Sequence, residues 1–375
     1  MRWLQLKHDF PCIFRQEFLL GNESGYVRIM MNRFISSLVF STLIIFIPWI
    51  VQAEDSRRYS PPTTSLDVIE LKLEWKDPKR SRDIPVKIYY PKETTGTYPV
   101  IIFSHGLGGS RDGYEYLGRH WAGCGYICVH IQHLGSDDGV WKNAPIAERT
   151  GALQKAALNV RGALDRPLDV QFTIDQLEKL NSDTTSPLHH MLDLAKIGVS
   201  GHSYGGYTAL AIAGQTFLLP LSASKRYDEP RIKAGIQMSA PAPANRRDMD
   251  QTYGSITIPI MHMTGTKDFL EILPQTTAED RRIPFDHMNH SETCLVIFND
   301  GDHMIFSGRG RVGSPEKLAQ DAEFQKLICS GTTAFWDAYL KELSSAKQWL
   351  FEGAFVKLLG DQATFECKTP IVSIK

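Results

Sequence analysis

The sequence has no excess of charge of either sign. Lysine and arginine number 41 and aspartate and glutamate number 42, so the formal net charge of the 375 residues is -1. Nucleic-acid binding depends on a net basic surface that displaces counterions from phosphates. No long run of lysine and arginine offsets the balanced composition. The sequence therefore predicts a protein with no nucleic-acid partner.

Cysteine is also scarce. The chain has six cysteines, with no C-x-x-C pair and no cysteine and histidine set at zinc-site spacing. This pattern argues against a disulfide scaffold, and we expect neither a metal nor an organic cofactor. Cys12 belongs to the N-terminal segment, and the odd number left predicts at most two disulfides, with most thiols buried as small apolar side chains. The five remaining cysteines are Cys124, Cys128, Cys294, Cys329 and Cys367.

One long hydrophobic run stands near the N-terminus. Residues 34–51 contain no charged side chain, follow Arg33, and end in the small-x-small sequence Val51-Gln52-Ala53. A basic segment, an apolar core and a small-residue cleavage site are typical of a secretory signal peptide. We therefore expect a secreted or periplasmic protein whose mature chain starts near Glu54. The alternative is an uncleaved anchor, for which the run is short; that anchor is the only expected source of membrane proximity.

An upstream extension precedes this signal pattern. It contains Asp9, Glu17 and Glu23, whereas a signal peptide begins with its basic segment. The pattern indicates that translation starts at Met30 or Met31, and the alternative is an unusually long basic segment. Residues 1–53 are therefore interpreted as an upstream extension and a signal peptide.

The rest of the chain predicts a linker, residues 54–65, and a single α/β domain, residues 66–375. Residues 66–75 and 84–90 alternate apolar with polar side chains, as half-exposed antiparallel strands do. Later strands are continuous apolar runs, which are typical of parallel strands covered by helices on both faces. The predicted parallel strands are residues 100–103, 127–129, 197–199, 256–263 and 294–298, and the predicted helices are residues 114–122, 146–164, 170–180, 205–213 and 316–343.

The strongest chemical motif is Gly201-His202-Ser203-Tyr204-Gly205, which follows an apolar strand and precedes an apolar helix. This order is that of a nucleophile elbow, in which a tight, strained turn exposes the serine hydroxyl. Glycines flank the turn because a Cβ there would collide with neighbouring backbone. The first amides of the helix then face the site of a developing oxyanion. We therefore predict Ser203 as a nucleophile, against the alternative of an ordinary glycine-rich turn.

Three segments together resemble the α/β-hydrolase superfamily. They are the elbow, the strand Ile-Pro-Val-Lys-Ile-Tyr-Tyr-Pro at 84–91, and Pro-Val-Ile-Ile-Phe-Ser-His-Gly-Leu-Gly-Gly at 99–109. More narrowly, residues 83–340 are similar to an exported branch related to dienelactone hydrolases and platelet-activating-factor acetylhydrolases. The resemblance implies a mostly parallel central sheet with antiparallel N-terminal strands and helices on both faces. Dienelactone hydrolases carry cysteine where Ser203 stands, so the resemblance does not imply dienelactone cleavage.

The same resemblance implies a catalytic triad in the order serine, acid, histidine. Asp268, in the loop after residues 259–264, matches the family's acid, and His303, after residues 294–298, matches its base. A serine hydroxyl needs an imidazole to accept its proton, and the imidazole needs a carboxylate to fix its tautomer. Both candidates follow strands, where a parallel sheet places its site.

Two backbone amides are expected to form an oxyanion hole. One belongs to Tyr204, directly after the nucleophile. The resemblance assigns the other to Leu107, in the loop after Gly106.

Other residues compete for the triad. Asp300 and Asp302 flank His303, but neighbours on one loop seldom reach the far ring nitrogen of that histidine. His202 lies inside the elbow with its side chain expected to point away from the nucleophile, and His262 lies in the middle of a strand. Both histidines are interpreted as packing residues.

Three further histidines have other predicted roles. His105 precedes the oxyanion glycine and is interpreted as a structural hydrogen-bonding residue. His287 and His290 form a loop pair with Asp286 that could contact substrate or bind a metal. Three ligands on one loop are fewer than a metal site requires, so we expect no metal site.

These features together predict a serine hydrolase that cleaves a carboxylic ester through an acyl-enzyme. The expected substrate is a small-molecule ester, a lipid or a polyester. Two alternatives remain open: a serine peptidase or amidase on the same fold, and a catalytically inactive extracellular binding module. Such modules commonly lose the nucleophile or the base, whereas candidates for both are present here as Ser203 and His303.

The signal-peptide hypothesis makes a direct prediction. N-terminal sequencing of the exported protein from its native host should find a chain that begins at or near Glu54. Recovery of a membrane-bound chain that still carries residues 34–51 would instead establish the anchor.

Overall fold

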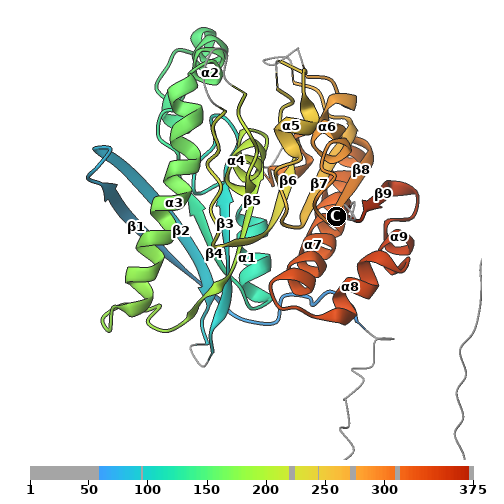
Figure 1. Ribbon diagram of the computed structural model, residues 1–375, viewed down its shortest axis with the longest axis horizontal. Helices are drawn as coiled ribbons and strands as arrows, with labels where there is room; N and C mark the ends of the chain where they lie inside the picture. Colours follow the sequence, from blue (N-terminus) through green and yellow to red (C-terminus); the bar gives the residue numbers. More distant parts are fainter. Residues whose placement is uncertain are drawn as a thin grey trace, which may run out of the picture. The chain divides into compact units, whose positions relative to one another are not determined.

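The apolar strands and their intervening helices build one mixed sheet (Figure 1). The computed structural model describes residues 59–93, 96–218, 224–243, 245–270, 276–308 and 313–370, so the predicted signal peptide and translation start lie outside the described residues. Within the described residues the strands lie in the order β1-β2-β4-β3-β5-β6-β7-β8-β9. The strands are β1 (Val68–Asp77), β2 (Arg82–Pro91), β3 (Tyr98–Ser104), β4 (Ile127–Ile131), β5 (Leu192–His202), β6 (Ile232–Met238), β7 (Ile260–Lys267), β8 (Thr293–Asp302) and β9 (Ala363–Lys368).

The centre of the sheet is parallel and its edges are antiparallel. Strands β4, β3, β5, β6, β7 and β8 run parallel to one another. The hairpin of β1 and β2 joins one side through antiparallel pairing of β2 with β4, and β9 pairs antiparallel with β8 on the other side. This arrangement is an α/β-hydrolase fold, and the predicted fold class is confirmed.

Helices cover both faces of the sheet, as expected for parallel strands that are apolar on both sides. Leu117 and Trp121 of α1 belong to the same apolar cluster as Phe335 and Trp336 of α7. The opposite face is covered by α3 and α4, and Figure 1 shows α7, α8 and α9 near the β8–β9 edge. The helices are α1 (Glu115–Gly123), α2 (Arg149–Ala157), α3 (Val160–Ser182), α4 (Tyr204–Ala213), α5 (Met249–Tyr253), α6 (Ile283–Asp286), α7 (Pro315–Tyr339), α8 (Ser344–Phe351) and α9 (Ala354–Leu359); the short 3-10 helices are η2 (Asp138–Val140), η3 (Ile146–Glu148), η4 (Glu279–Arg282), η5 (His303–Phe306) and η6 (Gly360–Gln362).

The prediction of helices at 146–164 and 170–180 was wrong about the position of the break. The first helix, α2, ends before Leu158 and Asn159, and α3 then runs without interruption through Pro167. Asn159 caps the new helix because its side-chain oxygen accepts the N–H of Gly162 at 3.2 Å. A proline removes one backbone donor, but it did not end this helix.

Three strands also differ from the prediction. Strand β6 was missed because Lys233 and Gly235 interrupt its apolar pattern; a Cβ at Gly235 would lie 2.6 Å from Ile260 Cδ1. Strand β9 was missed as well, so antiparallel pairing occurs at both edges. Strand β2 was expected to be half exposed, yet it is mostly buried, because Tyr89 packs in the apolar cluster on one face of the sheet and Val86 and Ile88 in the cluster on the other.

The segment predicted as a linker packs against the domain where it is described. Tyr59 donates its hydroxyl to Asp337 Oδ2 at 2.7 Å, and the N–H of Ser65 bonds the carbonyl of Gly123 at 3.2 Å. The five cysteines of the described chain are free thiols, three of them buried as expected and Cys367 exposed. Within the described residues, no helix is long and apolar enough to cross a membrane.

The parallel strands bring distant residues to one edge of the sheet. Gly106 follows β3, Ser203 follows β5, Ser239 follows β6, Asp268 follows β7 and His303 follows β8. Because parallel strands end at the same edge, the segments after them gather there. This edge carries the candidate site.

Candidate active site

The backbone at Ser203 is forced into a rare conformation. Ser203 has φ 58° and ψ -118° between the end of β5 and the start of α4. A Cβ at Gly201 would lie 2.3 Å from the carbonyl oxygen of Gly205, and a Cβ at Gly205 would lie 1.8 Å from that of Ser104. Both positions therefore require glycine, and the turn is the strained strand-to-helix elbow that the sequence predicted.

Two backbone amides next to Ser203 have no acceptor in the described part of the chain. The N–H of Tyr204 is the first of α4, where helical geometry supplies no partner. The N–H of Leu107 likewise donates to no described residue. Its loop approaches the elbow closely, since a Cβ at Gly106 would lie 3.3 Å from Ser203 Cβ. Tyr204 thus follows the serine directly, and Gly106, the residue before Leu107, lies against it; the role of the two amides as oxyanion donors stays a prediction.

Asp268 is fully buried directly after β7. One carboxylate oxygen accepts the hydroxyls of Thr264, at 2.7 Å, and Ser239. The other lies 2.6 Å from His303 Nδ1 and 3.3 Å from Arg281 Nε. Burial alone would raise the pKa of Asp268, but the hydrogen bond and charge of His303, together with Arg281 and Ser239, hold that pKa well below its usual range. Asp268 is therefore a carboxylate at neutral pH.

His303 begins η5 and is almost fully buried. Burial lowers the pKa of its imidazole below the ordinary histidine value, although Asp268 opposes this shift. The ring is therefore neutral at pH 7, and Nδ1 carries the proton because it faces a carboxylate. Nε2 is left as the hydrogen-bond acceptor.

The structure brings Asp268 and His303 together, but His303 is not hydrogen-bonded to the serine. Among the described residues, no hydrogen bond joins Ser203 Oγ to His303 Nε2. The two residues are linked through His202, whose ring centroid lies 4.6 Å from that of His303. Catalytic hydrogen bonds are often long in unliganded enzymes and tighten when substrate binds.

His202 packs as predicted and connects three parts of the site. Its Nε2 donates to the backbone carbonyl of His303 at 2.8 Å. In the neutral ring Nδ1 is then the acceptor, and it accepts the hydroxyl of Tyr114 at 2.9 Å. Burial lowers the pKa of His202 well below its ordinary value, which keeps the ring neutral. Tyr114 in turn accepts the N–H of Gly106 at 3.2 Å. The elbow, the histidine loop and the Gly106 loop are thereby joined.

The flanking carboxylates point elsewhere. Asp300 is exposed and pairs with Lys267 at 2.8 Å. Asp302 accepts the N–H of Met304 at 2.9 Å and lies 3.6 Å from Lys317 Nζ. Asp268 is therefore the carboxylate that meets the ring of His303.

The remaining histidines are mostly engaged within the fold. His262 is fully buried, as predicted, and His105 donates from Nδ1 to the carbonyl of Gly106 at 2.7 Å. The expected grouping of His287 with Asp286 is wrong. His287 pairs with Asp250 at 2.7 Å, because α5 and α6 lie against each other.

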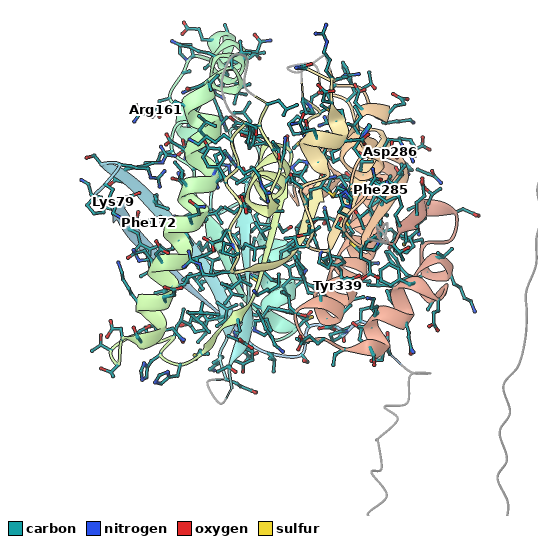
Figure 2. The ribbon with its side chains drawn as sticks, in the orientation of Figure 1. Lys79, Arg161, Phe172, Phe285, Asp286 and Tyr339 are labelled. Carbon is teal, nitrogen blue, oxygen red and sulfur yellow. The ribbon has the colours of Figure 1, made fainter. Side chains whose placement is uncertain are left out.

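Asp286, labelled in Figure 2, pairs with Arg282 one turn earlier at 2.9 Å. His290 is exposed. In the described part of the chain, no group of three histidine, cysteine or acidic side chains is arranged to hold a metal ion.

A second Ser-His-Asp set lies inside the protein. Ser104 Oγ is 3.0 Å from His133 Nε2, and His133 Nδ1 is 2.9 Å from Asp169 Oδ2. All three side chains are fully buried, and Ser104 lies within a regular strand rather than on a strained turn. Within the part of the chain that the structure describes, the elbow set lacks the serine–histidine hydrogen bond that this second set makes, and it differs in its backbone, since Ser203 has positive φ.

Sequence reasoning missed the residues that support Asp268. Ser239 follows the missed strand β6, so no motif drew attention to it. Arg281 is almost fully buried and donates from Nη1 to the carbonyl of Ser239 at 2.9 Å. Thr264 is the last residue of the predicted apolar run, and its role depends on the turn that follows. No signal in a single sequence marks these three side chains.

The elbow makes a prediction about stability that is independent of chemistry. Glycine adopts positive φ without a steric cost, whereas alanine does not. Ser203→Gly should therefore be more stable than Ser203→Ala by roughly 1–3 kcal/mol in the free energy of unfolding. At exposed Ala319 within α7, glycine should instead be less stable than alanine, by about 1 kcal/mol. Urea titration of the four proteins measures both differences, and the same order at both positions would contradict the strained turn.

Comparisons with known proteins agree with this fold. The family model described as platelet-activating factor acetylhydrolase, isoform II, matches residues 79–140, which contain Leu107 but not Ser203, Asp268 or His303. The chain is 32% identical over 150 residues to a platelet-activating factor acetylhydrolase of Cavia porcellus, covering 34% of each chain. It is 32% identical over 146 residues to the acetylhydrolase of Canis lupus familiaris, covering 32% of this chain and 33% of that one.

A third relative is cutinase est1 of Thermobifida alba, 25% identical over 174 residues, which cover 46% of this chain and 43% of the cutinase. The chain thus matches about a third of the length of the acetylhydrolases and less than half of the cutinase. The fold and these matches confirm the resemblance that the sequence motifs indicated: the chain has the α/β-hydrolase fold and is similar to the platelet-activating-factor acetylhydrolase branch of that superfamily.

Proposed function

We propose that this protein is a serine hydrolase that cleaves a carboxylic ester, with Ser203, His303 and Asp268 as its catalytic triad. The observation that carries the proposal is the buried pair of His303 Nδ1 and Asp268 at 2.6 Å, on the loops beside the strained elbow of Ser203. A carboxylate that fixes the tautomer of a neutral imidazole prepares that ring to accept a proton.

The first step is attack on the ester carbonyl. Neutral His303 accepts the proton of Ser203 at Nε2 as Oγ forms its bond to the carbonyl carbon. The resulting imidazolium is stabilised by the carboxylate of Asp268, which remains ionised. The carbonyl oxygen becomes an oxyanion, for which the N–H groups of Leu107 and Tyr204 are the proposed donors.

The second half of the reaction releases the acid. His303 passes its proton to the departing alcohol, and an acyl group remains on Ser203. Water then attacks this acyl-enzyme while His303 accepts one of its protons, and return of that proton to Oγ frees the carboxylic acid and restores the serine. Every proton is carried by His303, so the reaction as written needs no cofactor.

An ester is the substrate that the comparisons favour over an amide. The acetylhydrolases and the cutinase carry names that denote ester cleavage, which supports a small ester, a lipid or a polyester as substrate. We also infer that the protein is exported, on the signal pattern of residues 34–53.

Replacement of the nucleophile tests the reaction class. Ser203→Ala should abolish hydrolysis of p-nitrophenyl esters and covalent labelling by a fluorophosphonate, because both require Oγ. Profiling the wild type with acyl chains of increasing length, alongside a p-nitroanilide, ranks esters by size and separates esterase from amidase. A variant that hydrolysed esters as fast as the wild type would remove the proposal, and a wild type that neither hydrolysed esters nor reacted with the probe would favour the binding module.

Replacement of the acid and base tests the triad. Asp268→Asn should lower kcat by about 10⁴-fold, because an asparagine presents the wrong hydrogen-bonding partner to Nδ1. His303→Ala removes the proton acceptor itself and should lower kcat at least as much. Asp300→Asn is the matched control; it removes an exposed carboxylate three residues before His303, near the end of β8, and should change kcat less than about threefold. Equal losses in Asp300→Asn and Asp268→Asn would show that the acid has been assigned wrongly.

The pH profile follows from the same pair. Only neutral His303 accepts a proton, and burial lowers its pKa, so kcat/KM should rise with pH through an apparent pKa below the ordinary histidine value and stay level above it. Measured profiles that fall through this range as pH rises would contradict His303 as the general base.

A further inference from the structure

Arg166 is a fully buried arginine that faces the interior of the fold from α3. Arg161, labelled in Figure 2 on the same helix, is exposed instead. Among the described residues Arg166 makes no ion pair, because the nearby carboxylate of Asp169 is held by Arg80, Arg82 and His133. A buried charge without a counterion is costly, so its contacts need explanation.

Three neutral oxygens and one aromatic ring surround the guanidinium. Nη1 donates to Ser136 Oγ at 2.8 Å, Nε donates to Thr208 Oγ1 at 2.8 Å, and Nη2 donates to the backbone carbonyl of His105. The guanidinium carbon lies 4.7 Å from the ring centroid of Tyr204. One side chain therefore contacts both the loop after β3 and the helix after Ser203.

On the loop side, these bonds fix the direction of a peptide group. The carbonyl of Gly106 accepts from His105 Nδ1 at 2.7 Å and from the N–H of Gly109 at 3.0 Å. In a planar trans peptide the N–H points opposite to the carbonyl, so the N–H of Leu107 is turned away from these donors. Arg166 donates to the carbonyl of His105, one residue earlier. The N–H of Gly108, one residue after Leu107, donates to the backbone carbonyl of Ser136 at 2.9 Å.

On the helix side, the bonds reach the first residue of α4. Thr208 accepts from Arg166 and donates its hydroxyl to the carbonyl of Tyr204 at 2.9 Å. The ring of the same tyrosine lies against the guanidinium, an attractive cation–π contact. Tyr204, whose N–H is the second oxyanion donor, is thus held at its carbonyl and at its side chain.

We propose that Arg166 is a positioning residue of the oxyanion hole, which sets the Leu107 and Tyr204 amides at a fixed separation around the ester oxygen. The proposal rests on the proposed function, because it assigns these two amides to the transition state. Burial lowers the pKa of Arg166 to about 10, so the guanidinium stays protonated and all its bonds persist at neutral pH. A residue that acts on the oxyanion alone affects the transition state and leaves the ground-state substrate complex unchanged.

Three variants test this role. Arg166→Met keeps the length of the side chain and removes every donor, Arg166→Lys keeps the charge but not the planar fork, and Thr208→Val removes the link to Tyr204. Thr173→Val is the matched control: Thr173 is also fully buried and lies on α3, and its Oγ1 has no hydrogen-bond partner among the described residues. Each protein is first compared with the wild type by circular dichroism and thermal unfolding.

The readouts are kcat, KM and the inhibition constant of a trifluoromethyl ketone, which forms an oxyanion on the serine. Arg166→Met should lower kcat about 10²-fold, the loss typical of one oxyanion donor, with KM changed less than about threefold. Arg166→Lys should recover only part of this loss, and Thr208→Val should lower kcat about tenfold. The inhibition constant should weaken by the same factor as kcat/KM in each variant, and Thr173→Val should match the wild type.

Several results would overturn the proposal. One is a folded Arg166→Met or Thr208→Val protein whose kcat falls no further than that of Thr173→Val. Another is a loss of kcat with an unchanged inhibition constant for the trifluoromethyl ketone. Such a result would show that the variant lowers kcat without affecting binding of the oxyanion. If Arg166→Met does not fold, Thr208→Val alone decides between these outcomes.

The controls also separate this proposal from the proposed function. If Ser203→Ala is inactive while the Arg166 and Thr208 variants remain fully active, the esterase assignment stands and the positioning role is wrong. If Ser203→Ala is as active as the wild type, both fall together.

Discussion

The close approach of two backbones is the constraint on which the rest of the site depends. The helix after Ser203 begins so near the end of β3 that a Cβ at Gly205 would lie 1.8 Å from the carbonyl oxygen of Ser104. Only glycine permits this contact, and the contact in turn forces Ser203 to positive φ. The loop of Gly106 also lies against the serine, so the proposed nucleophile and the proposed oxyanion donors depend on one packing arrangement.

The two Ser-His-Asp sets show how much that constraint contributes. Ser104, His133 and Asp169 reproduce the side-chain contacts of a triad at 3.0 and 2.9 Å. Yet Ser104 lies in a regular strand, fully buried. Burial, aided by the charge of Arg166 nearby, lowers the pKa of His133 well below its ordinary value. The elbow set differs in its backbone, because Ser203 lies on a strained turn with positive φ. The proposed nucleophile is therefore distinguished by its backbone conformation rather than by its residue type.

The sequence predicted what depends on local pattern. The elbow could be recognised because glycine spacing, a preceding apolar strand and a following helix are all local features, and Asp268 and His303 could be matched because each follows a strand. The break in the helical region was misplaced because Asn159 caps α3 and Pro167 is tolerated inside it. Strand β6 was missed because Gly235 interrupts its apolar pattern; a larger residue at this position would collide with the side chain of Ile260.

What could not be predicted is the set of buried polar contacts between distant segments. Arg166 joins residues separated from it by 30 to 61 positions along the chain, and Arg281 lies beside Asp268 only because β7 and η4 pack together. A charged residue on a helix is ordinarily exposed, so composition and periodicity assign both arginines to the surface. Arg281 is instead buried beside the carboxylate of Asp268, and Arg166 is buried against the carbonyl of His105 and the ring of Tyr204. Glycines bring the backbone of this site together, and the two buried arginines donate hydrogen bonds to its carbonyl and hydroxyl groups. In the proposed reaction these contacts supply the preorganisation that electrostatic catalysis requires.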